Sequence, residues 1–262
     1  MPLLLRARRA ALALGGVERL RIVRDGKGLL LFWTRRGWED AAPFDAVLLH
    51  HGVTPNLNLA RAAGCELDWH EGNACFVPRT DAWGRTTVPG VLVAGDGAGI
   101  AGAEAAALGG RIAALAALAE LGAIGEAERD ARAAPLRAER ARWLRGRPFL
   151  DALYRPAPHF RAAAPDAVVC RCEEVTGAQV AEAARLGATG PNQLKAWLRC
   201  GMGPCQGRMC GLTVTEMVAA ARGVSPAEVG YLRLRTPVRP VTLAQIAALP
   251  RSEADRRAVE RL

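Results

Sequence analysis

The sequence has few aromatic residues, 5% of 262, only four histidines, and no basic segment interleaved with aromatic side chains. Its formal net charge is +9 and its pI is near 9.8, but all except two of the 35 basic residues are arginine, scattered along the chain. Nucleic-acid-binding proteins gather basic residues into one patch or stripe. We therefore ascribe the charge to an arginine-rich composition, with an acidic partner protein as the alternative. Nucleic acid is not expected as a partner.

A long uncharged apolar run is also missing. The longest apolar stretch, residues 100–124, carries Glu104, Arg111 and Glu120, which predicts a buried helix and no transmembrane segment. The seven cysteines are not accompanied by a secretory signal peptide, so a reducing compartment and a cytoplasmic location are expected. Residues 1–20, which contain several arginines, predict a short amphipathic helix.

Two motifs of dinucleotide-dependent redox enzymes are missing as well. Residues 1–125 contain no C-x-x-C pair, so a disulfide-reductase mechanism would have no dithiol to use. No G-x-G-x-x-G loop follows an opening strand, although that loop holds the pyrophosphate of a bound dinucleotide. A dinucleotide site built by this chain alone would therefore be incomplete.

The hydrophobic pattern predicts an α/β fold with a helical second half. A hairpin is expected around the turn at residues 25–28, followed by a continuously apolar strand at residues 46–50. A charged helix over residues 126–147 is expected to be interrupted at Pro135. The remaining elements are short strands near residues 65–69 and 74–78, a turn at 81–84, and helices at 57–63, 103–121, 176–186, 192–199 and 213–222.

Two close cysteine pairs lie in the second half, Cys170 with Cys172 and Cys205 with Cys210. The 32 residues between the pairs are enough for a helical hairpin, which would bring four thiolates to one metal centre. Zinc usually takes C-x2-C pairs and plant-type ferredoxins use C-x4-C-x2-C, so the spacing leaves zinc and [2Fe–2S] open. Buried core thiols or a disulfide are a third interpretation, which paired spacing in glycine-rich turns disfavours.

Glycines and cations surround the pairs, as an anionic cluster would require. Such a cluster is stabilised by backbone N–H groups in glycine-rich turns and by nearby Arg or Lys. Cys200, at the end of the predicted 192–199 helix, could replace Cys205 as a ligand. The neighbouring residues are Gly201, Gly203, Gly207, Gly211, Arg171, Lys195, Arg199 and Arg208.

Residues 168–176, 192–195 and 201–210 resemble the bacterioferritin-associated-ferredoxin-like [2Fe–2S] domain, which is a small all-α domain. The resemblance is to the version fused to the flavin-containing alpha subunits of opine, proline, hydroxyproline and glycine (cyanide-forming) dehydrogenase complexes. It implies a [2Fe–2S] cluster with Cys170, Cys172, Cys205 and Cys210 as ligands.

A second stretch, residues 85–102, is expected to contain a strand that ends in Gly95-Asp96 and leads through small residues into a helix. Small residues let a ligand approach the backbone closely, and a helix N-terminus favours an acceptor or an anion. The stretch resembles the second FAD-contact motif of pyridine-nucleotide-disulfide-oxidoreductase-like flavoproteins. The resemblance implies that Asp96 bonds the ribityl chain and that the flavin pyrimidine faces the helix start. The implied FAD contacts are Gly95, Asp96, Gly97, Gly102, Ala103, Glu104, Pro55 and Asn56.

Together these patterns predict a partial two-dinucleotide-binding-domain flavoprotein fold (1–125), a helical and proline-rich linker (126–165), a [2Fe–2S] domain (166–224) and a C-terminal tail (225–262). The tail residues 231–240 are expected to dock on this chain or a partner. The resemblance implies an electron-transfer component that passes electrons between FAD and the cluster during amino-acid or opine C–N oxidation. Its implied partners are a substrate-oxidising flavoprotein and a small [2Fe–2S] protein. The alternative is a non-catalytic metal-binding or assembly module with a remnant nucleotide-binding scaffold.

Overall fold

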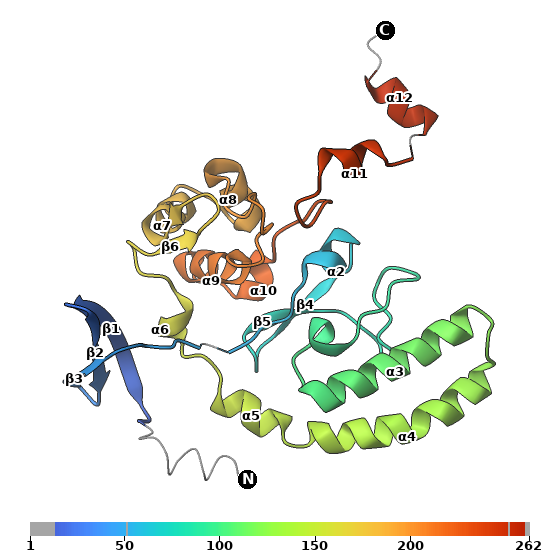
Figure 1. The fold of residues 1–262 in the computed structure, drawn as a ribbon, viewed down its shortest axis with the longest axis horizontal. Helices are drawn as coiled ribbons and strands as arrows, with labels where there is room; N and C mark the ends of the chain where they lie inside the picture. Colours follow the sequence, from blue (N-terminus) through green and yellow to red (C-terminus); the bar gives the residue numbers. More distant parts are fainter. Residues whose placement is uncertain (1–13, 51, 251, 260–262) are drawn as a thin grey trace. The chain divides into compact units, whose positions relative to one another are not determined.

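The computed structural model describes residues 14–50, 52–250 and 252–259. The chain divides into two compact units, Met1–His51 and Gly52–Leu262. We describe each unit by itself (Figure 1). None of the helices formed by the described residues is long and apolar enough to cross a membrane.

The first unit is an antiparallel three-stranded sheet with the strand order β1-β2-β3. The predicted hairpin is confirmed, with Asp25 pairing with Gly28 at its turn. A second tight turn, with Arg36 at φ 53° and Gly37 at φ 80°, leads into the third strand. The strands are β1 (Val17–Asp25), β2 (Gly28–Arg35) and β3 (Trp38–Phe44).

Two predictions near this sheet need correction. Residues 46–50 form no strand, because a short apolar run does not by itself determine strand pairing, and the third strand of the sheet ends at Phe44. The helix predicted over residues 1–20 lies largely outside the described residues, and its last residues, from Val17, belong to β1 instead.

The second unit begins with α2 (Asn58–Ala62), the antiparallel pair β4 (Leu67–His70) and β5 (Cys75–Pro78), and the short 3-10 helix η1 (Gly95–Ala98). The strand expected before Gly95-Asp96 is not formed, and Leu92 makes an isolated bridge with Arg85 instead. The predicted turn at residues 81–84 is confirmed, because Asp81 Oδ1 accepts hydrogen bonds from the N–H groups of Trp83 and Arg85.

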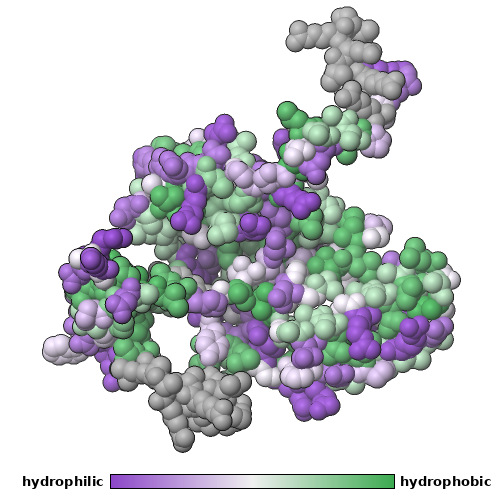
Figure 2. Space-filling model, viewed as in Figure 1, coloured by the Kyte–Doolittle hydropathy of each residue, from purple (hydrophilic) through white to green (hydrophobic). Residues whose placement is uncertain are grey.

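Two long helices follow, α3 (Ala103–Glu120) and α4 (Glu126–Leu144), and they pack against each other. Their shared core contains Leu108, Ile112 and Leu115 from α3 and Ala133 and Leu136 from α4. The predicted interruption at Pro135 is wrong, because α4 runs through it. Pro135 is exposed, so the carbonyl that loses its helical partner faces water. The outer side of α4 is largely hydrophilic, and the turn that joins it to α3 is apolar (Figure 2).

The rest of the unit is mainly helical. Thr176 and Ser225 each form a capping box at the start of a helix, and Pro191 begins another helix. A short antiparallel ladder accompanies the helices, so this region is not purely α. The elements are α5 (Arg147–Leu153), α6 (Pro158–Arg161), β6 (Val168–Cys170), β7 (Val175–Thr176), α7 (Gly177–Arg185), α8 (Pro191–Leu198), α9 (Gly211–Arg222), α10 (Pro226–Val229), α11 (Leu243–Ala247) and α12 (Glu253–Val259).

The start of the tail packs on its own chain, as one of the two predicted alternatives required. Leu232 and Leu234 are buried. Asn192 on α8 holds this segment: its Oδ1 accepts from the Arg233 N–H at 2.9 Å, and its Nδ2 donates to the Tyr231 carbonyl at 3.5 Å. The tail therefore helps to enclose the cysteine-containing region.

Candidate metal centre

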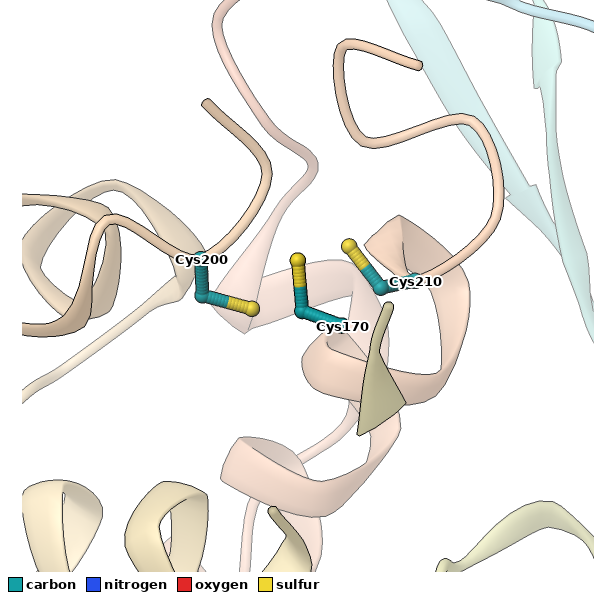
Figure 3. Close-up of side chains that lie close together, drawn as sticks. All are labelled: Cys170, Cys200 and Cys210. Carbon is teal, nitrogen blue, oxygen red and sulfur yellow. The ribbon is translucent and has the colours of Figure 1, made fainter. Parts of the chain in front are cut away.

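Three buried cysteines from different elements meet in the helical region. Cys170 ends β6, Cys200 follows α8, and Cys210 lies at the N-terminus of α9. Their sulfur atoms all lie within 4.8 Å of one another, and each residue is at most 2% exposed (Figure 3). Thiols gathered in this way are a suitable ligand set for zinc or an iron–sulfur cluster.

The other two cysteines of the region form a second, more accessible pair. Cys172 is exposed and Cys205 is half-buried, and their thiols are within hydrogen-bonding distance of each other. The Cys210 thiol contacts both Cys200 and Cys170. The predicted ligands Cys170 and Cys210 therefore share the buried group with Cys200, whereas Cys172 and Cys205 form a separate pair outside it. None of the chain's seven cysteines forms a disulfide.

Backbone groups of the 205–209 loop favour a thiolate at Cys205. Burial alone would raise the pKa of Cys205, but the N–H groups of Met209, Gly207 and Arg208, together with the Cys172 thiol, lower it overall. Gln206 at φ 50° and Gly207 at φ 73° give the left-handed turn that aims these N–H groups. Consecutive N–H groups of this kind form an anion-binding nest.

The pKa values of the Cys210 and Cys172 thiols are raised instead. Contact with the Cys200 thiol, followed by burial, raises the pKa of Cys210. The Cys205 backbone lowers the pKa of Cys172, but the Cys205 thiol and burial raise it overall. Burial, with Cys210 and Cys205 nearby, also raises the pKa of Tyr231 to about 12. Several neighbouring thiolates would repel one another, so a cation that binds them all would relieve this repulsion.

Close packing requires glycine at two positions of the loop. A Cβ added to Gly203 would lie 2.2 Å from the Cys172 Cβ, and one added to Gly207 would lie 2.3 Å from Leu232 Cδ1. Both distances are far below van der Waals contact. The glycine-rich sequence thus lets Cys172 and the tail approach the 205–210 loop.

The predicted FAD-contact residues occupy two places in the second unit. Gly95, Asp96 and Gly97 lie in η1, which contacts α3, and Gly102, Ala103 and Glu104 form the start of α3. Asp96 and the first α3 residues are exposed. Pro55 is buried and Asn56 is exposed, and both precede α2.

A small cavity lies behind the Gly95 turn. Its volume is about 90 Å³, well below the ~300–1,000 Å³ typical of small-molecule pockets. Its lining includes Trp83, Gly95, Ala105, Gly109 and Arg140. The exposed η1 turn and the start of α3 could together contact one edge of a flavin. The cavity is too small to enclose a flavin.

One residue of the site was not predicted. The side chain of Asn58, in α2, donates hydrogen bonds to the carbonyl oxygens of Cys205 and Gln206, both at 3.3 Å. It therefore connects the segment that contains Pro55 and Asn56 with the cysteine loop. No sequence pattern links residues that lie 147 and 148 positions apart.

Two family models match separate parts of the chain. Residues 17–118 match the pyridine nucleotide-disulphide oxidoreductase family, and residues 165–249 match the sarcosine oxidase A3 domain. The first match supports the predicted flavoprotein-type region. The [2Fe–2S] identity of the second region and the exact domain boundaries stay predictions.

Curated relatives are oxidoreductase subunits. The A subunit of opine oxidase from Rhizobium meliloti is 50% identical over 258 residues, which are 98% of this chain and 49% of the relative. Its counterpart from Agrobacterium tumefaciens (strain Ach5) is also 50% identical, over 98% of this chain and 52% of the relative. The HcnB subunit of hydrogen cyanide synthase from Pseudomonas aeruginosa is 35% identical over 78% of this chain and 44% of the relative. The chain thus spans about half the length of these relatives.

Among solved structures, the crystal structure of L-proline dehydrogenase from P. horikoshii aligns with a TM-score of 0.62. The alignment covers 87% of this chain and 43% of that one at 21% identity, so it shows a shared fold. The predicted resemblance to opine-dehydrogenase-type alpha subunits is confirmed at the level of homology. The chain is thus a relative of oxidoreductase subunits. Within this chain, the region that matches the pyridine nucleotide-disulphide oxidoreductase family precedes the region that matches the sarcosine oxidase A3 domain.

Proposed function

We propose that this chain is the electron-transfer part of a flavin-dependent oxidoreductase subunit. It passes electrons between FAD and a [2Fe–2S] cluster held by Cys170, Cys172, Cys205 and Cys210. The observation that carries the proposal is the pairing of these four thiols, with Cys172 in contact with Cys205 and the sulfur of Cys170 within 4.8 Å of that of Cys210. A diiron cluster takes two thiolates on each iron, so this donor set fits it.

The surroundings of the thiols also fit an anionic cluster. The N–H groups of residues 207–209 face the Cys205 sulfur and stabilise negative charge there. Cys170 and Cys210 are buried, which excludes water from one side of the centre, whereas Cys172 is exposed. When bound, the cluster supplies one-electron transfer. The exposed Cys172 edge gives an acceptor protein a place to approach.

The chain offers only part of a flavin site. Asp96 and the start of α3 at Gly102 to Glu104 would contact one edge of FAD, with Asn56 as a further contact. The glycine loop for the pyrophosphate and most of the enclosing surface would come from polypeptide outside these 262 residues. The relatives, which are about twice as long, are consistent with this division.

The names of the relatives suggest a reaction class for the assembly. We infer oxidation of an opine or amino acid at its C–N bond by a partner flavoprotein. Electrons would then reach an acceptor through the flavin and cluster sites of this chain, with a small [2Fe–2S] protein as a further partner. A cytoplasmic location fits the free cysteines.

A non-catalytic metal-binding or assembly module is the second candidate. It is favoured by the compact group of Cys170, Cys200 and Cys210, which with one more thiol would make a closed four-sulfur zinc site. Cysteine variants separate the two candidates. Cys172→Ala should abolish iron and sulfide binding while Cys200→Ala retains it if the proposed ligand set is right. A zinc site built on the buried group requires Cys200 instead.

The redox role is tested in the assembled complex. The chain is co-expressed with its neighbouring genes, purified without oxygen, and analysed for flavin, iron and sulfide. An added opine or amino acid should then bleach the flavin and reduce the cluster in sequence. A complex that contains no flavin, or whose flavin is reduced while the cluster stays oxidised, would contradict the proposed role.

A further inference from the structure

Asn58 is a buried polar residue whose side chain is hydrogen-bonded to the cysteine loop. Only 6% of its surface is exposed. Its Nδ2 donates to the carbonyl oxygens of Cys205 and Gln206, each at 3.3 Å. It therefore contributes both amide protons of one side chain to two successive peptide groups of the loop.

These two carbonyls belong to the part of the loop with unusual backbone conformation. Gln206 has φ 50° and Gly207 has φ 73°, and a left-handed conformation is unfavourable for glutamine. This turn directs the N–H groups of residues 207–209 toward the Cys205 sulfur. The amide of Asn58 binds the carbonyls of the same turn, so it stabilises the conformation that aims these N–H groups.

The other end of Asn58 is tied to the segment before α2. Its backbone N–H donates to Asn56 Oδ1 at 3.1 Å, and the intervening Leu57 is buried. Asn56 is exposed and is one of the predicted flavin contacts. A single residue thus holds the Pro55–Asn56 segment by its backbone and the Cys205 loop by its side chain.

We propose that Asn58 is a positioning residue that couples the Pro55–Asn56 segment to the metal centre. This inference rests on the proposed function. Asn58 keeps the N–H groups of residues 207–209 aimed at Cys205 and thereby stabilises the more negative, reduced state of the centre. A ligand that moves Asn56 would change the conformation of the Cys205 loop through the side chain of Asn58.

The test uses the full chain, loaded anaerobically with iron and sulfide, as wild type and as Asn58→Leu. The variant keeps the size of the side chain but has no donor. We expect a more negative reduction potential and about fivefold faster loss of the cluster to a chelator. That factor corresponds to about 1 kcal/mol, which is two lost hydrogen bonds at about 0.5 kcal/mol each, the low end of their net contribution. A role in folding alone would not move the potential.

Two further variants keep the result interpretable. Asn58→Asp preserves shape but turns a carboxylate oxygen toward the two carbonyls, so it should give the same changes if Asn58→Leu does not fold. Asn73→Leu, in the turn between β4 and β5, is the matched control and should behave as wild type.

The outcomes separate the inference from the proposed function. Wild-type potential and chelation rate in a folded Asn58 variant would overturn the inference while the proposed function stands. If the wild-type chain takes up no iron and sulfide, the proposed function fails and this inference falls with it. Equal changes in Asn73→Leu would show that the effect is not specific to the Asn58 contact, and would also overturn the inference.

Discussion

Gly203 packs against Cys172, so the added methyl group of Gly203→Ala tests whether the position of Cys172 matters for metal binding. In Gly203→Ala the new Cβ would lie 2.2 Å from the Cys172 Cβ and 3.2 Å from its Sγ. Optimal carbon–carbon contacts are about 3.5–4.0 Å, so the two residues must separate by more than about 1 Å. Metal–ligand distances tolerate only about 0.2 Å of deviation. The substitution should therefore remove Cys172 from the ligand set.

The stability cost is expected to be moderate. Overpacking of a buried site costs about 1–3 kcal/mol. In a chain of this size each kcal/mol lowers the Tm by roughly 2–4 °C. Thermal unfolding of the metal-free chain measures this cost, and iron and sulfide analysis after anaerobic loading measures the ligand loss. We expect a lower Tm and strongly reduced iron and sulfide.

Gly110→Ala is the control, because its Cβ would meet no atom within 4 Å and it lies inside α3. Alanine is favoured over glycine in a helix by about 0.5–1 kcal/mol, so this variant should be slightly more stable and load normally. A Gly203→Ala chain with wild-type Tm and full iron loading would refute both the close contact and the ligand role of Cys172.

Three further predictions concern stability and thiol chemistry. Thr215→Val removes a buried hydroxyl donor between α9 and the end of α10, and should lower the free energy of unfolding by about 1 kcal/mol in denaturant titration. Arg161→Met removes the partner of Glu216, whose pKa is already raised by burial, and should cost about 1–3 kcal/mol at neutral pH. Without Arg161 the pKa of Glu216 rises further, so this loss should be small in acid, where Glu216 is protonated, and should grow as the pH rises above the already raised folded-state pKa; a loss independent of pH would contradict it. In the metal-free chain, iodoacetamide should modify the exposed Cys172 well before Cys75, which is buried with a pKa of about 11, and peptide mass spectrometry would reveal the reverse order.

Local signals in the sequence were sufficient where the structure is decided by neighbouring residues. The capping boxes at Thr176 and Ser225 each need only a partner three residues away. Pro191 fixes the first turn of α8 for the same reason. That Cys170 and Cys210 approach each other was also predictable, because paired thiols in glycine-rich turns have few other uses, but the presence of Cys200 in the same buried group was foreseen only as an alternative.

Features that depend on distant contacts or rare backbone conformations were missed. The turn into β3 places Arg36 at positive φ, which is uncommon for a residue with a side chain. The apolar run at residues 46–50 was predicted to be a strand but forms none, because a short apolar run does not by itself determine strand pairing. Pro135 is tolerated within α4 because it faces water. The contact from Asn58 to the Cys205 loop exists only after the second unit has folded.

Metal analysis of the anaerobically purified 262-residue chain decides whether the cysteine region holds a [2Fe–2S] cluster. Iron, acid-labile sulfide and zinc are measured on one sample together with its visible absorption spectrum. We expect about two iron and two sulfide per chain, a visible spectrum that bleaches on reduction, and no stoichiometric zinc. About one zinc per chain without sulfide would contradict it.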